Sequence, residues 1–401
     1  MIRYYDYSIF GLSASILAKH FMPGNQNSDK TLAFYAIFSL ATIAKPLGSL
    51  IFGAIGDKMG RVYSVRISMI IAATSTCFVA FTPSFNQIGY FSVILITLLR
   101  MTFLMSLAGE TDAIKIYVAE MIGKNNRNLV VGVVSFSAQI GVLIASIAYH
   151  IANCYDEIEW LWKANFVIGG FLGFIAISMR ELFLETPAFL NSKLLKDNVV
   201  NQSTDEIIIN NKVKFLLATI ISGSLGGVYN FLIIFLASFA ANIANIIDYK
   251  TAAMANILFI IIYGLSCIVS GYLADKLKKN SQVIIALLLS IICIMFMRYS
   301  NYSLMLHLLL VALVPFYSIP SYILVQSLFH INIRMRMYGL SHSIGSMILS
   351  STTPFICMSI WQSTENVSLV LGYFLFQLAL LFFALLYMIK KDYNNMFETI
   401  N

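Results

Sequence analysis

Charged residues are scarce in this chain. Of its 401 residues, 11% are Asp, Glu, Lys or Arg, whereas 59% are apolar. A soluble domain carries about 25% charged residues, because its surface has to be covered with polar groups. The composition therefore excludes a soluble enzyme, a disordered protein and a nucleic-acid-binding domain. The excess of 26 Lys and Arg over 19 Asp and Glu is interpreted as a signal of membrane topology and not of an anionic partner.

The sequence also lacks the motifs of catalysis and cofactor binding. It has no Gly-rich loop ending in Gly-Lys-Ser or Gly-Lys-Thr, which an ATP-driven transporter needs to hold phosphates. It has no group of His and Cys residues at metal-ligand spacing, and no nucleophile with a base beside it can be recognised. Four of its five cysteines lie in apolar runs, where Cys behaves as a small hydrophobe, so no disulfide framework is implied. We therefore expect no enzyme activity, no cofactor and no metal site.

Long apolar runs are abundant. A helix needs about 20 mostly apolar residues to span a bilayer, and strands would leave backbone groups unpaired in lipid. The sequence therefore predicts an all-α membrane protein with twelve transmembrane helices. The predicted segments lie near 2–21, 31–56, 66–82, 90–120, 129–152, 161–179, 215–241, 251–273, 281–299, 303–328, 337–360 and 368–389.

The distribution of basic residues predicts the orientation. If the N-terminus is cytoplasmic, most Lys and Arg outside the segments fall in cytoplasmic connections. Only Lys19, Lys30, Lys163, Lys250 and Arg298 then lie on the outer side. Because cytoplasmic connections carry the excess of Lys and Arg, we expect both termini in the cytoplasm of a bacterial cell. The protein is expected to be a multi-pass protein of the cytoplasmic (inner) membrane.

One long polar connection, residues 180–214, divides the twelve segments into six and six. The predicted domains are an N-terminal six-helix bundle over 1–179, this central cytoplasmic loop, a C-terminal six-helix bundle over 215–392 and a short tail over 393–401. Such parallel halves predict a substrate site near the middle of the membrane, between the bundles.

An internal repeat supports the division. The stretch Gly53–Arg61 follows the second segment and contains Asp57, and Gly271–Lys279 follows the eighth segment and contains Asp275. In each stretch, small residues precede Asp and Lys, and further basic residues follow. The Asp can cap a helix start and pair with a neighbouring Arg, so we expect Gly53, Asp57, Arg61 and Asp275 to form a motif that stabilises one arrangement of the two halves. An ordinary charged loop is the alternative.

The first of these stretches resembles the signature loop of the major facilitator superfamily. Further stretches are similar to its metabolite:proton symporter branch, which includes proline/betaine, α-ketoglutarate, citrate and shikimate carriers. The resemblance implies two six-helix bundles and proton-coupled transport. Lys45 and Lys163 stand where the family usually has Arg. The similar stretches are Tyr5–Tyr7, Ala44–Gly48, Leu99-Arg100, Gly109-Glu110, Tyr117–Glu120, Trp162-Lys163, Glu185–Phe189 and Arg334–Gly339.

Ionisable residues within the segments are functional candidates, because a charge at the bilayer centre costs about 2.5–3.5 kcal/mol. Glu110 lies near the middle of its segment and has no basic residue one helical turn away, so we expect it to exchange the coupling proton. Arg100 lies about 15 Å from it along the helix and would bind a substrate carboxylate. Structural ion pairs between helices are the alternative for both residues.

The other candidates have their own alternatives. Asp6 is a coupling candidate that could instead lie at the membrane interface. Asp112 and Lys115 are three residues apart, so they could neutralise one another. Glu120 is expected to brace the Asp57 loop. In the C-terminal half, Tyr229 and Asn230 are candidate substrate contacts, although lone polar residues often bind a neighbouring helix.

The expected function is secondary active transport by alternating access. The substrate would be a small polar metabolite, either amino acid- or betaine-like or a carboxylate, and the coupling ion a proton. The bilayer is the other expected partner, and no nucleic acid is expected. An exporter or exchanger of the same fold is one alternative, and a degenerate carrier that acts as a sensor or assembly partner is another.

Overall fold

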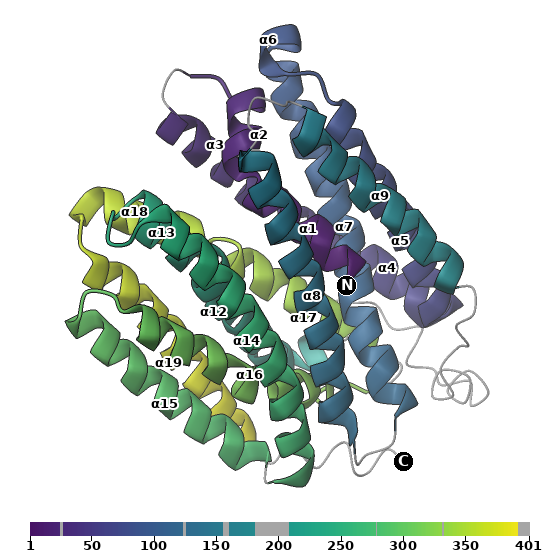
Figure 1. Cartoon of the computed structure of the whole chain (residues 1–401). Coiled ribbons are helices and arrows are strands. Elements are labelled where there is room, and N and C mark those ends of the chain that lie inside the picture. Colours follow the sequence, from purple (N-terminus) through teal and green to yellow (C-terminus); the bar gives the residue numbers. More distant parts are fainter. Residues whose placement is uncertain are drawn as a thin grey trace. The chain divides into compact units, whose positions relative to one another are not determined.

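The computed structural model describes residues 1–24, 27–122, 126–154, 160–180, 208–277, 279–330 and 333–391 (Figure 1). In these residues all regular secondary structure is helical, without strands, which confirms the all-α prediction. Eleven of the described helices or helix runs are long and apolar enough to cross a membrane. The cytoplasmic placement of both termini stays a prediction.

Contacts divide the chain into two compact units, each described by itself. Unit 1 comprises residues 1–113 and 137–185, and unit 2 comprises residues 114–136 and 186–401. Much of the predicted central loop and the whole predicted tail lie outside the described residues, so the domain boundaries stay predictions.

The helices from the N-terminal half of the sequence belong mainly to unit 1. Two of them extend into unit 2: α7 from residue 114 to its C-terminal end, and α8 from its N-terminal end to residue 136. The bounds are α1 Ile2–Leu12, α2 Ala14–Phe21, α3 Asn27–Ala41, α4 Ala44–Met59, α5 Arg61–Phe81, α6 Phe85–Ile88, α7 Tyr90–Met121, α8 Arg127–Cys154 and α9 Trp160–Arg180.

The first predicted segment, 2–21, forms α1 and α2, which are separated only by Ser13. The Ser13 amide still donates to the carbonyl of Ile9, and the Leu17 amide donates to the carbonyl of Ser13. The hydrogen-bond ladder thus continues across the interruption, although this first predicted segment is not among the eleven candidate spans.

The predicted loop after the second segment is shorter than expected. Helix α4 continues to Met59, and α5 begins at Arg61, so Gly60 alone makes the connection. Its φ of 114° is in a region that residues with a Cβ rarely adopt. This requirement explains a glycine directly before Arg61.

Unit 2 contains two π-helical segments, η3 and η4, which the sequence pattern did not predict. Its elements after residue 207 are α12 Lys212–Tyr229, η3 Asn230–Phe235, α13 Leu236–Asn242, α14 Tyr249–Lys276, α15 Lys279–Tyr299, α16 Leu304–Gln326, α17 Arg334–Gly345, η4 Ser346–Ser350, α18 Thr353–Thr364 and α19 Val367–Lys390.

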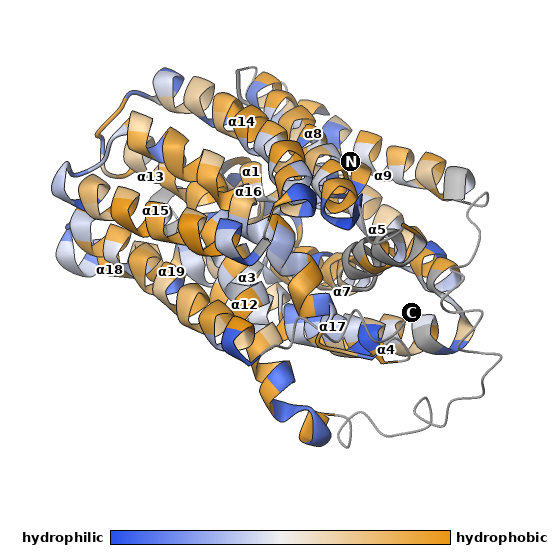
Figure 2. Ribbon diagram, turned by 90° about the horizontal axis from the view of Figure 1, so that it is seen from below, coloured by the Kyte–Doolittle hydropathy of each residue, from blue (hydrophilic) through white to orange (hydrophobic). Residues whose placement is uncertain are grey.

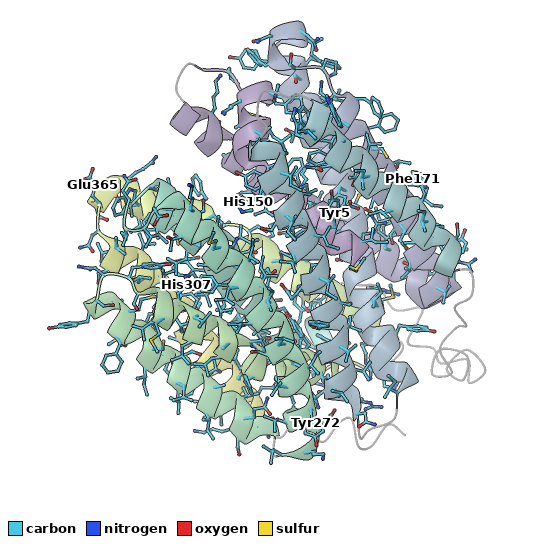
Figure 3. The ribbon with its side chains drawn as sticks, in the orientation of Figure 1. Tyr5, His150, Phe171, Tyr272, His307 and Glu365 are labelled. Atoms are coloured by element: carbon cyan, nitrogen blue, oxygen red, sulfur yellow. The ribbon has the colours of Figure 1, made fainter. Side chains whose placement is uncertain are left out.

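The outward-facing side chains fit a lipid environment. Figure 2 shows hydrophobic residues along most of the helix lengths and hydrophilic residues mainly near helix ends and connections. Large apolar side chains such as Phe171, Met254, Met305 and Phe383 are exposed, and Phe171 points away from α9 in Figure 3. Exposure of so much apolar surface to water would cost free energy, whereas contact with lipid does not.

Candidate functional site

Arg100 lies in the interior of unit 1, in the middle of the span Tyr90–Ala108. Its side chain is 3% exposed. The guanidinium carbon is 4.2 Å from the ring centre of Phe10, 4.9 Å from that of Phe103 and 5.2 Å from that of Tyr7. Aromatic faces attract a desolvated cation. The three rings therefore fix the position of the guanidinium within the apolar interior.

Asp6 is buried beside this arginine and is not at the surface of the unit. Its carboxylate is 3.6 Å from the guanidinium of Arg3, which also donates to the Met69 carbonyl at 2.8 Å. Asp6 and Arg100 line one cavity of about 10 Å³, together with side chains of α5 such as Ser75. That volume is about the minimum for one water molecule. Two of the predicted site residues, from α1 and α7, thus meet in one cavity.

Lys45 adds a second cation near the same aromatic group. It is buried in the first turn of α4, and its amine is 5.7 Å from the ring centre of Tyr7. Arg100 lies 5.2 Å from that ring. The interior of unit 1 therefore gathers two cations around Tyr7 of α1, a residue that the sequence marked only as part of a resemblance.

For six of the predicted site residues, the structure describes the helix but not the side chain. Helices α4, α5 and α7 carry them, but the side chains lie outside the described part of the chain. Their roles stay predictions. They are Asp57, Arg61, Glu110, Asp112, Lys115 and Glu120.

The two predicted contacts in unit 2 lie at the junction of α12 and η3. The Tyr229 ring stands edge-on to Tyr263, with ring centres 5.3 Å apart. Asn230 is buried, and its Nδ2 donates to both the carbonyl and the hydroxyl oxygen of Ser350, each at 3.0 Å. In this structure Asn230 therefore binds a neighbouring helix, as the structural alternative proposed.

Two buried polar residues of unit 2 were missed as candidates. Gln377 of α19 donates from Nε2 to the Leu349 carbonyl at 3.0 Å. His307 of α16 has its Nε2 2.9 Å from the Leu232 carbonyl, and Figure 3 labels it inside the unit. Each of these residues is a lone polar residue within a long apolar run, and this isolation is the feature of the sequence that could have marked it as a candidate.

Asp275, one of the predicted motif residues, binds the first turn of α8. Its carboxylate accepts from the Asn128 amide at 3.1 Å, from Asn128 Nδ2 at 2.7 Å and from the Leu129 amide at 2.8 Å. The first amides of a helix have no partners within the helix, and its N-terminus attracts negative charge. Asp275 satisfies both requirements. Gly53, from the other repeat, is buried in α4.

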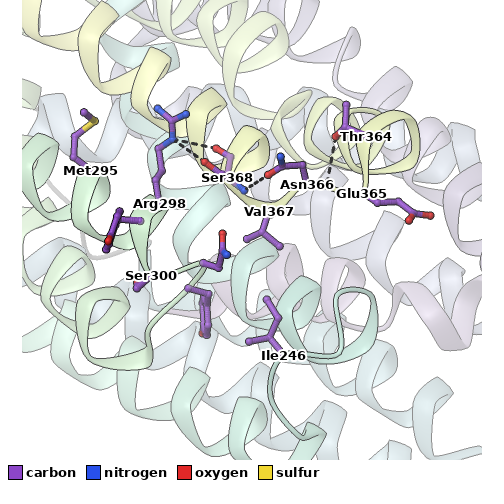
Figure 4. A pocket seen from close by; sticks show the side chains of 12 residues that line it. Ile246, Met295, Arg298, Ser300, Thr364, Glu365, Asn366, Val367 and Ser368 are labelled. Carbon is purple, nitrogen blue, oxygen red and sulfur yellow. Dashed lines mark hydrogen bonds between the residues drawn. The ribbon is translucent and has the colours of Figure 1, made fainter.

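A larger depression of about 1040 Å³ lies among three connections of unit 2 (Figure 4). Arg298 at the end of α15 and Ser368 at the start of α19 border it, and Arg298 Nε donates to the Ser368 carbonyl at 3.1 Å. This depression is wide and open and contains none of the predicted site residues. In the part of the chain that the structure describes, no three His, Cys, Asp or Glu side chains are grouped as metal ligands.

Comparison with known proteins identifies the family. The family model of the Major Facilitator Superfamily matches residues 1–350. The chain belongs to this superfamily. It is therefore a multi-pass membrane protein, and the resemblance noted in the sequence is confirmed.

Curated relatives are bacterial transporters. The chain is 34% identical over 192 residues to the proline/betaine transporter of Salmonella typhimurium, an alignment that covers 47% of this chain and 38% of that protein. It is 24% identical to a putative proline/betaine transporter of Staphylococcus haemolyticus, over 91% of this chain and 80% of that protein. The first alignment thus spans well under half of the relative's length.

Solved structures confirm the fold. The proton:xylose symporter XylE matches with a TM-score of 0.76 and 17% identity, over 97% of this chain and 92% of that one. The human organic anion transporter MFSD10 matches with a TM-score of 0.68 and 15% identity, over 95% of this chain and 97% of that one. At these identities the likeness extends to the fold alone.

Proposed function

We propose that this protein is a secondary active transporter that carries a small polar metabolite across the inner membrane together with a proton. The observation that carries the proposal is the cavity shared by Asp6 and Arg100 inside unit 1. Buried ionisable groups within membrane segments are costly, and they commonly mark substrate or proton pathways. The names of the curated relatives support the same function.

The coupling step follows from the charges that surround the cavity. An ionised Asp6 carboxylate offsets the positive charge of Arg3 on α1 and of Arg100 on α7. Protonation of Asp6 removes this negative charge, and Arg100 then attracts an external anion more strongly. Binding of a proton at Asp6 would therefore favour binding of a substrate carboxylate at Arg100. This coupling gives symport with one proton per carboxylate.

The substrate class follows from Arg100 and from the relatives. A guanidinium offers several donors in a planar arrangement that suits a carboxylate. Proline and betaine both contain a carboxylate, and so do the dicarboxylates carried by other transporters. We propose an amino acid-like, betaine-like or other carboxylate-bearing metabolite.

The motif residues have a separate proposed role. Asp275 holds the start of α8 in one position through three hydrogen bonds. We assign Gly53, Asp57 and Arg61 to the matching function in the other repeat, and Glu120 of α7 to the same conformational role. These residues would govern conformational exchange, whereas Arg100 and Asp6 would govern binding and coupling.

Reconstitution into proteoliposomes tests the proposal. Labelled proline, betaine, amino acids and dicarboxylates are offered with an inward proton gradient, and the protein should accumulate one of these classes. A protein that exchanges substrate but never accumulates it would support the exchanger. A protein that binds a compound without moving it would support the sensor.

Three carboxylate variants then locate the proton. Asp6→Asn resembles the protonated acid, so it should exchange substrate across the membrane but lose pH-driven accumulation. Glu110→Gln tests the same role for Glu110, and Asp112→Asn is the comparison variant, because Lys115 is expected to keep Asp112 ionised. Loss of accumulation in Glu110→Gln alone would move the coupling site from Asp6 to Glu110.

A further inference from the structure

Two membrane helices of unit 2 change from α- to π-helical geometry within their length. Segment η3 follows α12, and segment η4 follows α17. A π segment adds a residue to one turn and disturbs the regular ladder of backbone hydrogen bonds. Inside a bilayer no water can satisfy the displaced carbonyls, so other protein groups have to do so.

The two π segments are joined directly by Asn230 and Ser350. Asn230 Nδ2, at the start of η3, donates to the carbonyl oxygen of Ser350, at the end of η4. In a continuous helix this carbonyl would accept from the amide of residue 354, but Pro354 has no N–H. Asn230 supplies the donor that Pro354 lacks.

Side chains from two other helices hold the same segments. Gln377 Nε2 of α19 donates to the Leu349 carbonyl at 3.0 Å and lies 2.8 Å from the Thr353 hydroxyl, so it links the end of η4 to the start of α18. His307 of α16 binds η3 in a similar way, through the Leu232 carbonyl at 2.9 Å. Because a carbonyl only accepts, His307 Nε2 carries the hydrogen.

The helices beyond the π segments are also in contact. Helix α13 continues from η3, and α18 continues the chain after η4. The ring of Phe239 on α13 stands edge-on to the ring of Trp361 on α18, with centres 5.2 Å apart. The two helices lie beside each other in Figure 1. This contact is a route by which a movement of one helix can act on the other.

We propose that η3 and η4 form one paired hinge, on which α13 and α18 swing together as a gate of unit 2. Asn230 and Gln377 are the positioning residues that hold this hinge closed. Their amide hydrogen bonds can break and re-form without unfolding either helix, whereas ladder bonds of an α-helix cannot. The inference rests on the transport function proposed above, because alternating access requires a gate that opens.

Hydrogen exchange of the full-length protein in lipid nanodiscs tests the hinge without a known substrate. In Gln377→Leu, amides of 231–242 and 346–364 should exchange faster together, by about tenfold, the effect of losing one buried hydrogen bond. Gln282→Leu is the matched control, because Gln282 Nε2 also donates to backbone carbonyls, those of Ser270 and Phe316, outside the π segments. It should leave both ranges unchanged.

A rescue experiment separates positioning from general stability. Asn230→Ala should speed exchange in both ranges, and Pro354→Ala should restore slow exchange in the double variant, because alanine supplies an amide for the Ser350 carbonyl. A rise confined to one range, no rise at all, an equal rise in Gln282→Leu or the absence of rescue would each overturn the proposal. If Gln377→Leu does not fold, the Asn230 and Pro354 variants decide alone.

Transport assays keep this inference distinct from the proposed function. Gln377→Leu should change the maximal transport rate by about fivefold or more while KM changes less than twofold, since a conformational step and not binding is altered. A change of this size in KM, with the maximal rate unchanged, would contradict the positioning role of Gln377.

If the wild-type protein moves no compound but the exchange pattern holds, the transport proposal fails and the hinge stands. If transport occurs but the two ranges exchange independently, the hinge fails and transport stands.

Discussion

The interiors of the two units satisfy their buried polar groups in different ways. Unit 1 buries Arg3, Asp6, Lys45 and Arg100, and aromatic rings face the cations of Lys45 and Arg100. In the described part of unit 2, the polar groups deep within the spans are neutral, and some of them, such as Asn230 and Gln377, bind backbone carbonyls. The arginines that unit 2 buries, Arg334 and Arg336, lie in the first turn of α17.

This difference indicates that the two units have different roles in transport. Buried charges are suited to binding ions and charged substrates, because their free energy changes strongly with a nearby charge. Neutral amides at irregular backbone are suited to holding a conformation, because they exchange partners at small cost. We therefore assign binding and coupling to the interior of unit 1 and a gate to unit 2.

The largest expected effect comes from the central cation of unit 1. Arg100→Lys should lower kcat/KM for transport by roughly 10- to 150-fold, the loss of a charge-assisted hydrogen bond worth about 1.5–3 kcal/mol. A lysine ammonium cannot provide the planar fork that fits a carboxylate. Labelled uptake measures this loss.

Arg298→Lys in unit 2 is the matched control, because it makes the same exchange at the end of a helix, where Arg298 binds Ser368. It should transport within about twofold of wild type. Equal losses in the two variants would remove the functional contrast between the units.

The next effect concerns backbone packing in unit 2. Gly345 of α17 lies against α12 so closely that a Cβ would be 2.8 Å from the amide nitrogen of Gly223. Because the neighbour is backbone and cannot turn away, Gly345→Ala should destabilise the protein by about 1–3 kcal/mol. The thermal unfolding midpoint in detergent measures this effect.

Gly372→Ala on α19 is its control, since the nearest atom to that Cβ would be 3.8 Å away. Its midpoint should stay near that of wild type. If Gly345→Ala unfolds at the wild-type temperature, α12 and α17 can move apart freely, and the described packing does not limit the gate.

A smaller effect is expected for the cap of α8. Asp275→Asn keeps one carbonyl acceptor but loses the second acceptor and the negative charge, which together contribute about 0.5–2 kcal/mol. The maximal transport rate should change while the substrate Kd stays within a few-fold. Asp57→Asn in the other repeat is expected to behave in the same way. A parallel loss of binding and transport in either variant would contradict the conformational role of the repeat.

The smallest effect is a pH dependence at the start of α14. The Asp248 carboxylate accepts from the hydroxyl and amide of Thr251, and these hydrogen bonds hold the pKa of Asp248 below its usual value. Its contribution is fully present above the unfolded-state pKa and is lost as the pH falls through the lower folded-state pKa. The wild type should therefore lose stability relative to Asp248→Asn, which caps without titrating, only at pH values below about 4. Thermal unfolding at pH 7 and pH 3 measures this difference, and a gap that is constant with pH would exclude the cap.

The sequence by itself determined the helical membrane fold and the family. Backbone groups in lipid have to form their hydrogen bonds within the protein, and a helix does so within one segment, so long apolar runs predict helices. Short local stretches of the sequence carry the resemblance to the superfamily. It also singled out Asp6 and Arg100, because an ionisable residue in an apolar run is conspicuous without any structure.

Only the tertiary structure decided which of these residues meet. Asp6 and Arg100 are 94 positions apart in the chain, and the fold of unit 1 brings residues of α1, α5 and α7 together around one cavity. The π segments were invisible in the sequence because hydrophobic periodicity over a few residues does not distinguish 3.6 from slightly more residues per turn. Gln377 and Asn230 gained their roles from carbonyls that other helices present, and a linear sequence does not show which carbonyls lack an amide partner.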